Sequence, residues 1–588
     1  MVKRYAAIWL IFCCIFPAIA SGKAGLTQEG MGQCVPSRFS GAQTGTILAN
    51  AIASTGGSGL PDCSGEKTLL IEPGTWAITS NLTIPKRMLP QVVSGGLFNV
   101  ANGVTLVLER CPVAGHYQIF TGTGEISLPY GCEANPYWFG GDDSGISDST
   151  TALTKMIRSS SSWEIPVGTW RVASTVEICK QNVKMRGHGW SSAIVPDNSI
   201  TAIRVGGDGS TTCIAAGDTA NPSGVEFHNM KFDHTLGGAT SIDLDGASHV
   251  HVEGVWFYNC GSSLLGCVHA DDTGSGFPGA HVFINNRWQM STGALAGYYS
   301  EGSVPLVVQF QGGGMANAGT ARTAGGINVQ ANGRVVIVEG MDFENLLRPI
   351  NVNGTGRVYA NGNGFEGNVD SGGSGEIVCD RNCTITNNVF NGTAANPAYA
   401  IHLSTNEGAR IYGNRSFGHA SGFVLRQNFG QTFIGPNDTD GDSGSVVVID
   451  GAESRNVALD LDSTPATLDF DDVQVTISSR RLIVNDGIKF HRAGVTVGAT
   501  DTLDTVESSV SLNCTNGGGC SITMGETAAE DGQTIRICNE STNTATILNS
   551  AGVAHLNGGS NQALGQYDCL TLDYFGDRWI QSIPTSNN

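Results

Sequence analysis

Apolar and polar residues alternate in short stretches through the middle of the chain. From residue 225 to about 435 one pattern recurs: an apolar strand, a Gly or Asn turn, a second strand and an aromatic residue. In the stretches 242–244, 327–329, 350–352 and 401–403 every second residue is apolar. Alternation of this kind predicts strands with apolar side chains facing inward and polar side chains facing outward.

Aromatic residues mark the repeat. They are separated by 25, 31, 55, 22, 25 and 27 residues, the 55 corresponding to two turns, and are Phe232, Phe257, Trp288, Phe343, Phe365, Phe390 and Phe417. Three residues before each stands Asn or Gly, the types that readily adopt a left-handed backbone: Asn229, Gly254, Asn285, Gly340, Gly362, Asn387 and Asn414. This period predicts an all-β chain wound as a parallel β-solenoid, with the aromatics stacked in one core column.

A longer repeat precedes the solenoid pattern. The sequence EPGTW at 72–76 and the sequence IPVGTW at 165–170 place their tryptophans 94 residues apart, and each is followed by an alternating strand. Between them, residues 149–157 predict a short helix with Asp148 or Ser149 as its N-cap.

Four short motifs now carry a family resemblance. WFGGDDSG at 138–145, DSTTAL at 148–153, PVGTW at 166–170 and RGHG at 186–189 together resemble the opening of the pectate-lyase-like superfamily. The resemblance covers about residues 70–450 and implies a right-handed parallel β-helix. Members include polysaccharide lyases, glycoside hydrolases, uronate epimerases and phage tailspikes. Because these motifs cap the helix and carry no chemistry, they imply a fold and not an activity.

Four segments follow from these patterns. Residues 1–20 have a basic start, an apolar centre and small residues at the end, which predicts a secretory signal. We expect a β-rich cap at 21–135, the β-helix at 136–460 and a smaller β-sandwich-like domain at 468–588. The last resembles small β domains that terminate phage tail and bacterial surface proteins. Its expected roles are capping, oligomerisation, for example as a homotrimer, or glycan binding.

Charge and cysteine content limit the classes of partner and the cell compartment that we expect. The net charge of −20 disfavours nucleic acid and anionic membranes, and no segment after residue 20 is apolar for the ~20 residues that a spanning helix needs. Fourteen cysteines remain once Cys13 and Cys14 leave with the signal, an even number that predicts disulfides in a secreted or cell-surface protein. Three close pairs are the expected bridges: Cys260/Cys267, Cys379/Cys383 and Cys514/Cys520.

Candidate chemistry concentrates between residues 228 and 281, where six of the twelve histidines lie. By the alternation, Asp243 and Asp245 face outward on one rung, and His269 and Asp271 face outward on the next. On a neighbouring sheet, four further residues face outward: Glu226, His228, His251 and Glu253. Trp256 and Tyr258 are candidate platforms for sugar rings.

These residues allow three interpretations. In the first, paired carboxylates and an imidazole exchange protons with a glycan; the catalytic candidates are then Asp243, Asp245, Asp271, His269 and Glu253, and the substrate-binding candidates are His251, Trp256 and Tyr258. In the second, clustered carboxylates bind Ca²⁺ that neutralises uronate groups. In the third, the face is merely a solvated polar surface. No residue is assigned as a metal ligand.

The function that these calls predict is that of a secreted polysaccharide-active protein. As an enzyme it would be a glycoside hydrolase or a polysaccharide lyase. The alternative is a non-catalytic surface adhesin or a virion tailspike that binds glycans, and the sequence leaves the choice open.

Overall fold

The computed structural model describes residues 32–471 and 492–586, apart from internal gaps of eleven residues or fewer. The chain divides into two compact units, Met1–Thr476 and Ile477–Asn588. The predicted signal at residues 1–20 lies outside the described residues. Among the residues that are described, no helix is both long and apolar enough to cross a bilayer.

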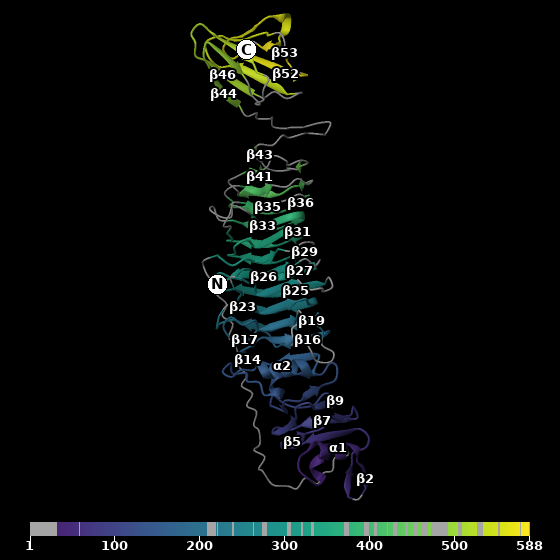
Figure 1. Ribbon diagram of the computed structural model, residues 1–588. Helices are drawn as coiled ribbons and strands as arrows, with labels where there is room; N and C mark the ends of the chain where they lie inside the picture. The colour runs from purple at the N-terminus through teal and green to yellow at the C-terminus, as the bar shows by residue number, and fades with distance from the viewer. Residues whose placement is uncertain are drawn as a thin grey trace, which may run out of the picture. The chain divides into compact units, whose positions relative to one another are not determined.

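The chain first forms three small parallel sheets, which make short coils of their own (Figure 1). Their strands are β1 (Gln33–Cys34), β4 (Lys67–Ile71) and β7 (Met88–Val92); β5 (Gly74–Ile78), β8 (Gly96–Val100) and β10 (Phe120–Gly122); and β6 (Leu82–Ile84), β9 (Thr105–Leu108) and β11 (Glu125–Ser127). The antiparallel pair β2 (Thr55–Gly57) and β3 (Leu60–Asp62) lies beside α1 (Gly45–Ala53) in the sequence. Thr44 is the N-cap of α1, where its hydroxyl accepts from the amide of Ile47 at 3.4 Å.

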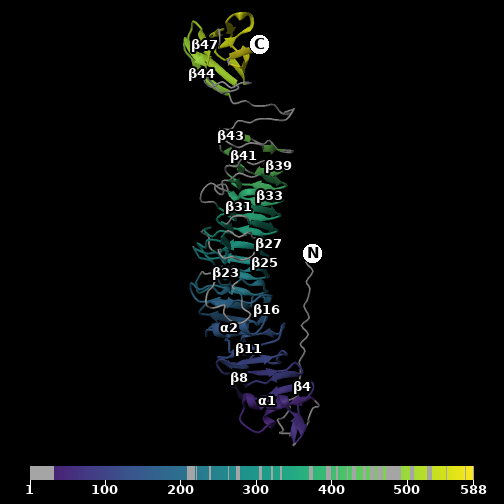
Figure 2. The ribbon, with the colours of Figure 1, turned by 45° about the vertical axis from the view of Figure 1, so that its right-hand side comes forward.

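The predicted helix is α2 (Thr150–Ser159), which is labelled in both ribbon views (Figures 1 and 2). It contacts β11, β13 (Ser162–Ile165) and β15 (Val176–Ile178). The Asp148 carboxylate accepts from the amide of Thr150 at 2.9 Å and so satisfies one free donor of its first turn. The longer repeat is structural. Trp76 and Trp170 are both fully buried, and each indole N–H donates to the carbonyl four residues earlier, at 3.3 Å and 3.0 Å.

Thirty-two strands of the described residues then wind into one continuous parallel β-helix with three faces. The first face contains β12 (Glu133–Ala134), β13 (Ser162–Ile165), β16 (Val183–Gly187), β19 (Ser223–His228), β22 (Ser248–Glu253), the first parts of β25 (Ala280–Met290) and β27 (Val307–Asn317), β29 (Val335–Glu339), the second parts of β31 (Ile350–Asn361) and β33 (Gly375–Thr386), β36 (Ala409–Tyr412), β39 (Thr432–Ile434) and β42 (Val457–Leu459).

The second face contains β14 (Gly168–Val172), β17 (Ser192–Pro196), β20 (Lys231–Asp233), β23 (Trp256–Cys260), the second parts of β25 and β27, β30 (Asp342–Glu344), β32 (Gly364–Glu366), β34 (Val389–Asn391), β37 (Arg415–Phe417) and β40 (Asp438–Gly441). The third face contains β15 (Val176–Ile178), β18 (Ile203–Gly206), β21 (Ile242–Asp245), β24 (Val268–Asp272), β26 (Tyr298–Gly302), β28 (Ile327–Val329), the first parts of β31 and β33, β35 (Tyr399–Leu403), β38 (Gly422–Arg426), β41 (Ser445–Asp450) and β43 (Leu468–Asp471). The fold class predicted from the sequence, a right-handed parallel β-helix, is confirmed.

The predicted aromatic column runs along the interior of the second face. Phe232 stacks on Phe257 with ring centroids 5.8 Å apart, and Phe257 stacks on Trp288 at 4.2 Å. Farther along, Phe365 stacks on Phe343 at 5.0 Å and on Phe390 at 4.7 Å. The irregular rung within the 55-residue gap is β27, which places buried Met315 in register between Trp288 and Phe343.

The last member of the predicted column is wrong by one position. Ser416, not Phe417, pairs with Phe390 and is buried, whereas Phe417 pairs with Asn391 and is partly exposed. The left-handed residue of this rung is accordingly Gly413 (φ 68°), and not Asn414. Asn414 instead belongs to an internal ladder, in which its side-chain amide donates to Asn437 and its oxygen accepts from Asn388, both at 2.9 Å.

The second unit has two sheets around a core of its own. One sheet contains β44 (Arg492–Val497), β46 (Ser509–Cys514), β48 (Thr534–Asn539), β52 (Cys569–Phe575), β53 (Arg578–Ser586) and β50 (Ala554–His555); the other contains β45 (Thr500–Leu503), β47 (Cys520–Met524), β49 (Ala545–Ile547) and β51 (Gln562–Leu564). From β44 to β49 the chain alternates between the sheets with parallel pairing, as a solenoid does, and it closes with the antiparallel pair β52–β53.

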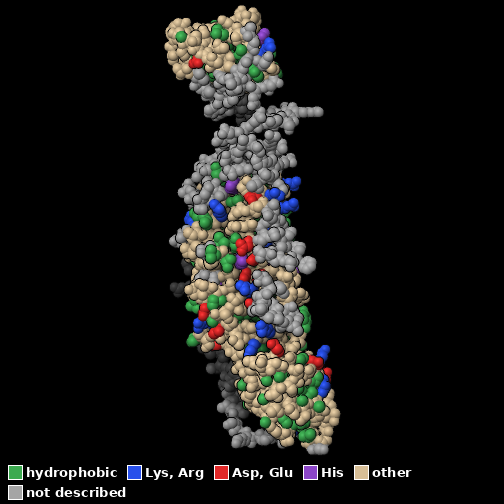
Figure 3. All heavy atoms as spheres, viewed as in Figure 1, with side chains coloured by type: hydrophobic (Ala, Val, Ile, Leu, Met, Phe, Trp, Pro, Cys, Tyr) green, Lys and Arg blue, Asp and Glu red, His purple; other side chains and the backbone are tan. Residues whose placement is uncertain are grey.

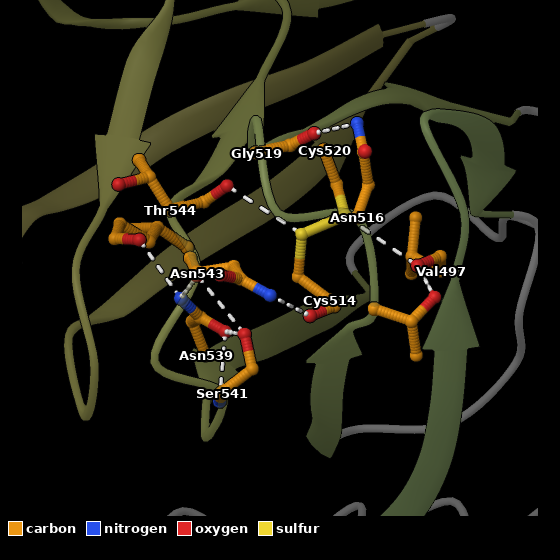
Figure 4. The surroundings of a disulfide bond; sticks show 11 residues. Val497, Cys514, Asn516, Gly519, Cys520, Asn539, Ser541, Asn543 and Thr544 are labelled. Carbon is orange, nitrogen blue, oxygen red and sulfur yellow. Dashed lines mark hydrogen bonds between the residues drawn. A yellow bond between two sulfur atoms is a disulfide. The ribbon is translucent and has the colours of Figure 1, made fainter.

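Disulfides tie turns in both units. The three predicted bridges, Cys260–Cys267, Cys379–Cys383 and Cys514–Cys520, are confirmed. Three further bridges join Cys34 to Cys63, Cys111 to Cys132 and Cys538 to Cys569. Figure 4 shows Cys514 and Cys520 linking the two sheets of the second unit, where Asn543 donates to the carbonyl of Cys514 at 2.9 Å.

The aromatic column predicts that two phenylalanine-to-alanine substitutions lower the free energy of unfolding by different amounts. Phe365→Ala should lower the free energy of unfolding by about 3–5 kcal/mol, because it opens a cavity between two stacked rings. Phe417→Ala should cost about 1 kcal/mol or less, because that ring lies outside the column. Urea unfolding followed by circular dichroism measures both, and equal losses for the two variants would contradict the corrected register.

Candidate functional site

Two ladders of outward side chains lie side by side on the third face. Along one, Arg204, Asp243, His269 and Tyr299 are in register on β18, β21, β24 and β26. Along the other, two positions further in each strand, the register aligns Asp245, Asp271 and Glu301. The structure therefore brings together the four predicted residues Asp243, Asp245, His269 and Asp271 on adjacent rungs. Figure 3 shows acidic side chains beside a histidine at the level of β26.

The His269 imidazole is held between two carboxylates. Its Nδ1 lies 2.9 Å from Asp243 Oδ1, and its Nε2 lies 3.0 Å from Glu301 Oε1. Arg204 Nε donates to the other oxygen of Asp243 at 3.1 Å, and the Tyr299 hydroxyl donates to Glu301 Oε2 at 3.0 Å. The His269 and Asp243 side chains are 8% and 13% exposed, whereas Glu301 is 42% exposed. The chain of contacts thus runs from a buried carboxylate to one in contact with solvent.

These contacts shift the pKa values in opposite directions. Burial alone would raise the pKa of Asp243, but hydrogen bonds and charge from His269 and Arg204 lower it below its ordinary value of 3.8. Burial alone would lower the pKa of His269, but hydrogen bonds and charge from Asp243 and Glu301 raise it above 6.5. Burial, followed by the hydrogen bond to Glu301, raises the pKa of the Tyr299 hydroxyl. For His269 and Asp243, the contacts therefore favour the charged forms more than water does, that is, an imidazolium beside a carboxylate.

Glu301 is the residue that the sequence reasoning missed. It lies on β26, within the irregular rung of the 55-residue gap, where no aromatic residue marks the repeat. Gly312 (φ 62°) stands three residues before buried Met315, as a turn residue stands before each aromatic. This spacing could have marked the missing rung, and with it the strand that carries Glu301. The hydroxyl of Tyr299, on the same strand, contacts Glu301.

The remaining predicted residues lie on the other two faces. Glu253 and His251 are on β22 of the first face, together with Glu226 and His228 of β19. Trp256 and Tyr258 are on β23 of the second face. The predicted site is therefore distributed over three faces of the helix and does not form one groove.

Trp256 and Tyr258 belong to an aromatic and cationic surface. Trp256 packs against Trp190 with ring centroids 4.8 Å apart and against Tyr258 at 5.1 Å. The Lys231 ammonium lies 4.5 Å and 4.3 Å from the Trp256 and Tyr258 rings, and the Arg287 guanidinium lies 5.1 Å from Trp256. Such a surface can stack on sugar rings and attract negative groups.

Two of the six clustered histidines are core residues. His234 and His281 are fully buried, and burial lowers their pKa values to about 3 and about 4. His281 lies 3.2 Å from the Tyr298 hydroxyl and 3.1 Å from the carbonyl of Ala247, so both ring nitrogens have partners. These neutral imidazoles are structural, and the clustering of histidines in the sequence overstates the size of any site.

Three solved structures illustrate what the chain is similar to. No family model and no curated protein matches the chain. A similar solved structure is the catalytic unit of a GH87 alpha-1,3-glucanase from Streptomyces thermodiastaticus strain HF3-3, with a TM-score of 0.37, 14% identity and coverage of 60% of this chain and 72% of that chain. Another is the Streptococcus pneumoniae surface adhesin PfbA, with a TM-score of 0.35, 11% identity and coverage of 61% and 97%. A third is tailspike protein 3 of Bacteriophage CBA120, with a TM-score of 0.33, 14% identity and coverage of 59% and 62%.

The strand pairings of the chain itself show the parallel β-helix. No activity passes from these proteins to this one.

The contacts of His269 predict its titration. We expect a pKa above 6.5, and Asp243→Asn should lower it because one of the two stabilising carboxylates becomes neutral. Nuclear magnetic resonance of ¹³C-labelled histidines measures the change. Glu253→Gln on the first face is the control and should leave His269 unchanged.

The same shifts predict a window of pH. The raised pKa of His269 stabilises the fold fully below pH 6.5, and this contribution is lost as pH rises through the raised value. The lowered pKa of Asp243 stabilises it above pH 3.8, and that contribution is lost as pH falls through the lowered value. The difference in melting temperature between the wild type and Asp243→Asn should therefore be largest between pH 3.8 and pH 6.5, where both contributions are fully present. A difference independent of pH would contradict the ion pair.

Proposed function

We propose that the protein is a secreted polysaccharide-active protein that cleaves a glycan on the third face of its β-helix. The observation that carries the proposal is the imidazole of His269, which connects a buried carboxylate to the solvent-exposed Glu301. A surface that only needs solubility has no reason to bury a charged imidazole, because burial disfavours the charge. The disulfides support export, since such bridges form in oxidising compartments.

Cleavage of a glycosidic bond by hydrolysis or elimination needs a proton donor and a proton acceptor. We assign the donor to the His269–Glu301 pair, with Tyr299 positioning Glu301 through its hydroxyl. Asp243 is a positioning residue that holds the imidazole, and Arg204 holds Asp243.

We assign the acceptor to Asp271, which lies in register between Asp245 and Glu301. It would take the proton from water in a hydrolase or from a sugar carbon in a lyase. Neighbouring rungs are about 4.8 Å apart, so the Asp271 and Glu301 side chains can approach one sugar unit together. The Asp245, Asp271 and Glu301 ladder also keeps the prediction of Ca²⁺ open, since carboxylate oxygens are its preferred ligands.

The aromatic and cationic surface of the second face supports a second contact with glycan. Trp256 and Tyr258 offer aromatic surface, and Arg287 adds positive charge on a chain that is acidic overall, whereas Lys231 is already paired with Asp233 at 2.6 Å. We propose that this surface holds the chain of an acidic polysaccharide. The prediction for His251 as a substrate contact remains untested, and its position on the first face separates it from both surfaces.

One observation favours the non-catalytic alternative. Both ring nitrogens of His269 already contact carboxylates, which is also the arrangement of a structural ion-pair network. The protein would then be an adhesin or tailspike-type glycan binder. Trimerisation or adhesion through the second unit remains a prediction.

Incubation with a panel of neutral and acidic polysaccharides separates these functions. Formation of reducing ends with ultraviolet absorbance of unsaturated products indicates a lyase, and reducing ends alone indicate a hydrolase. Glu301→Gln and Asp271→Asn should each lower kcat by about 10²–10⁴-fold, the usual contribution of acid–base groups. A parallel series with EDTA and with added Ca²⁺ tests the calcium prediction.

Glu253→Gln is the matched control, because it alters an outward carboxylate on another face. If no polysaccharide is cut, or if Glu301→Gln cuts as fast as the wild type, the catalytic proposal fails. Retained glycan binding that Trp256→Ala abolishes would then establish the binder.

A further inference from the structure

Four side chains on the first face form a square of alternating residue types. Glu226 and His228 project outward from β19, and His251 and Glu253 project outward from β22 on the next rung. The register pairs Glu226 with His251 and His228 with Glu253, so each histidine has a glutamate both along its strand and across the rungs. This arrangement is separate from the third-face site and plays no part in the function proposed above.

The ligand atoms of the square converge. One oxygen of Glu226 and one ring nitrogen each of His228 and His251 all lie within 4.8 Å of one another, and no other group of three or more such side chains in the described residues does so. His228 Nε2 lies 2.9 Å from Glu226 Oε2. The two imidazole rings meet edge to face with centroids 5.3 Å apart.

His228 is oriented by the fourth member of the square. Its Nδ1 lies 3.3 Å from Glu253 Oε2, and the side chain is 10% exposed. Because a carboxylate only accepts, Nε2 donates to Glu226 as the structure stands; a metal ion bound at Nε2 would displace that proton, and Glu253 would accept from Nδ1. Metal-bound histidines have this outer carboxylate as a rule.

His251 supplies an independent sign that a partner is missing. Its Nε2 is shielded from solvent and makes no hydrogen bond. The nearest charged group is Glu253 Oε2 at 3.9 Å, beyond hydrogen-bond distance. A buried polar atom without a partner destabilises the fold, and a cation bound between these side chains would supply one.

We propose that Glu226, His228 and His251 bind a divalent transition-metal ion, best Zn²⁺, with Glu253 as the outer partner of His228. Two imidazole nitrogens and one carboxylate oxygen are ligands that Zn²⁺ takes and Ca²⁺ does not prefer. The fourth position opens to solvent, because the Glu226 and Glu253 side chains are 41% and 45% exposed.

The surrounding rungs limit the site to these two strands. Val282 and Ile284 align with His251 and Glu253 on β25 and offer no ligand. On the other side Lys184 and Arg186 align with Glu226 and His228, and Lys184 Nζ lies 3.5 Å from Glu226 Oε2. Binding requires Lys184, which is 46% exposed, to release Glu226 into the site.

Titration of the purified, tag-free protein with Zn²⁺ tests the site. Isothermal calorimetry should show one ion per chain, and Co²⁺ should give the visible absorption of a four-coordinate nitrogen and oxygen site. His251→Ala and Glu226→Gln should each weaken Zn²⁺ binding by about 100-fold or more, and Glu253→Gln by about 10–100-fold, as loss of an outer partner does. Excess Ca²⁺ should not displace the Zn²⁺.

Two controls make the outcome decisive. His249→Ala removes an exposed histidine of the same strand that lies outside the square and should leave binding unchanged. His269→Gln alters the third face and should also leave it unchanged. Circular dichroism confirms that each variant folds. Absence of a 1:1 site, or a site that survives His251→Ala or is lost in His269→Gln, overturns the proposal and leaves the proposed glycan cleavage untouched.

Discussion

The lateral register between successive rungs is the constraint on which the molecule depends. Parallel hydrogen bonding fixes each residue beside one residue of the rung before and one of the rung after. Inside the helix this register places Phe257 between Phe232 and Trp288. Outside, the same bonding places His269 between Asp243 and Tyr299. Core and surface ladders are therefore two consequences of one pairing, and a slip of one residue would change both at once.

The sequence predicts this register well wherever a large aromatic marks the rung. It fails in two places, and both have a physical reason. Met315 fills the column between Trp288 and Phe343 as an aromatic would, since its flexible thioether adapts to the space. In the sequence, however, a methionine cannot be distinguished from other apolar residues as the marker of a rung. At the last predicted rung Ser416 takes the inward position. His419 lies 3.0 Å from its hydroxyl and 3.2 Å from Glu376, so the aromatic column gives way to a buried polar network.

The candidate site is predictable in part for the same reason. Alternation predicts which side chains face outward, and it correctly places His269 and Asp271 on the rung next to Asp243 and Asp245. It does not state which of the three faces a strand joins, because that depends on turn lengths between faces. Glu253, Trp256 and His269 are close in sequence, yet they lie on the first, second and third faces. The sequence also gives no prediction of α1, because the residues after its N-cap Thr44 have no strong helical periodicity.

Histidines and carboxylates on two faces show how their arrangement decides the chemistry open to them. On the third face, His269 is a single imidazole whose two ring nitrogens both contact carboxylates. On the first face, the rings of His228 and His251 meet edge to face, and Nε2 of His251 makes no hydrogen bond. Net charge does not distinguish the two groups, because Asp245 and Asp271 flank the third-face contacts while Lys184 and Arg186 lie in register with Glu226 and His228 on the first face. Two nitrogen donors, one of them without a partner, favour a cation, whereas one imidazole between two carboxylates favours proton transfer. The partners that the register gives each imidazole therefore separate a metal site from an acid–base site on this scaffold.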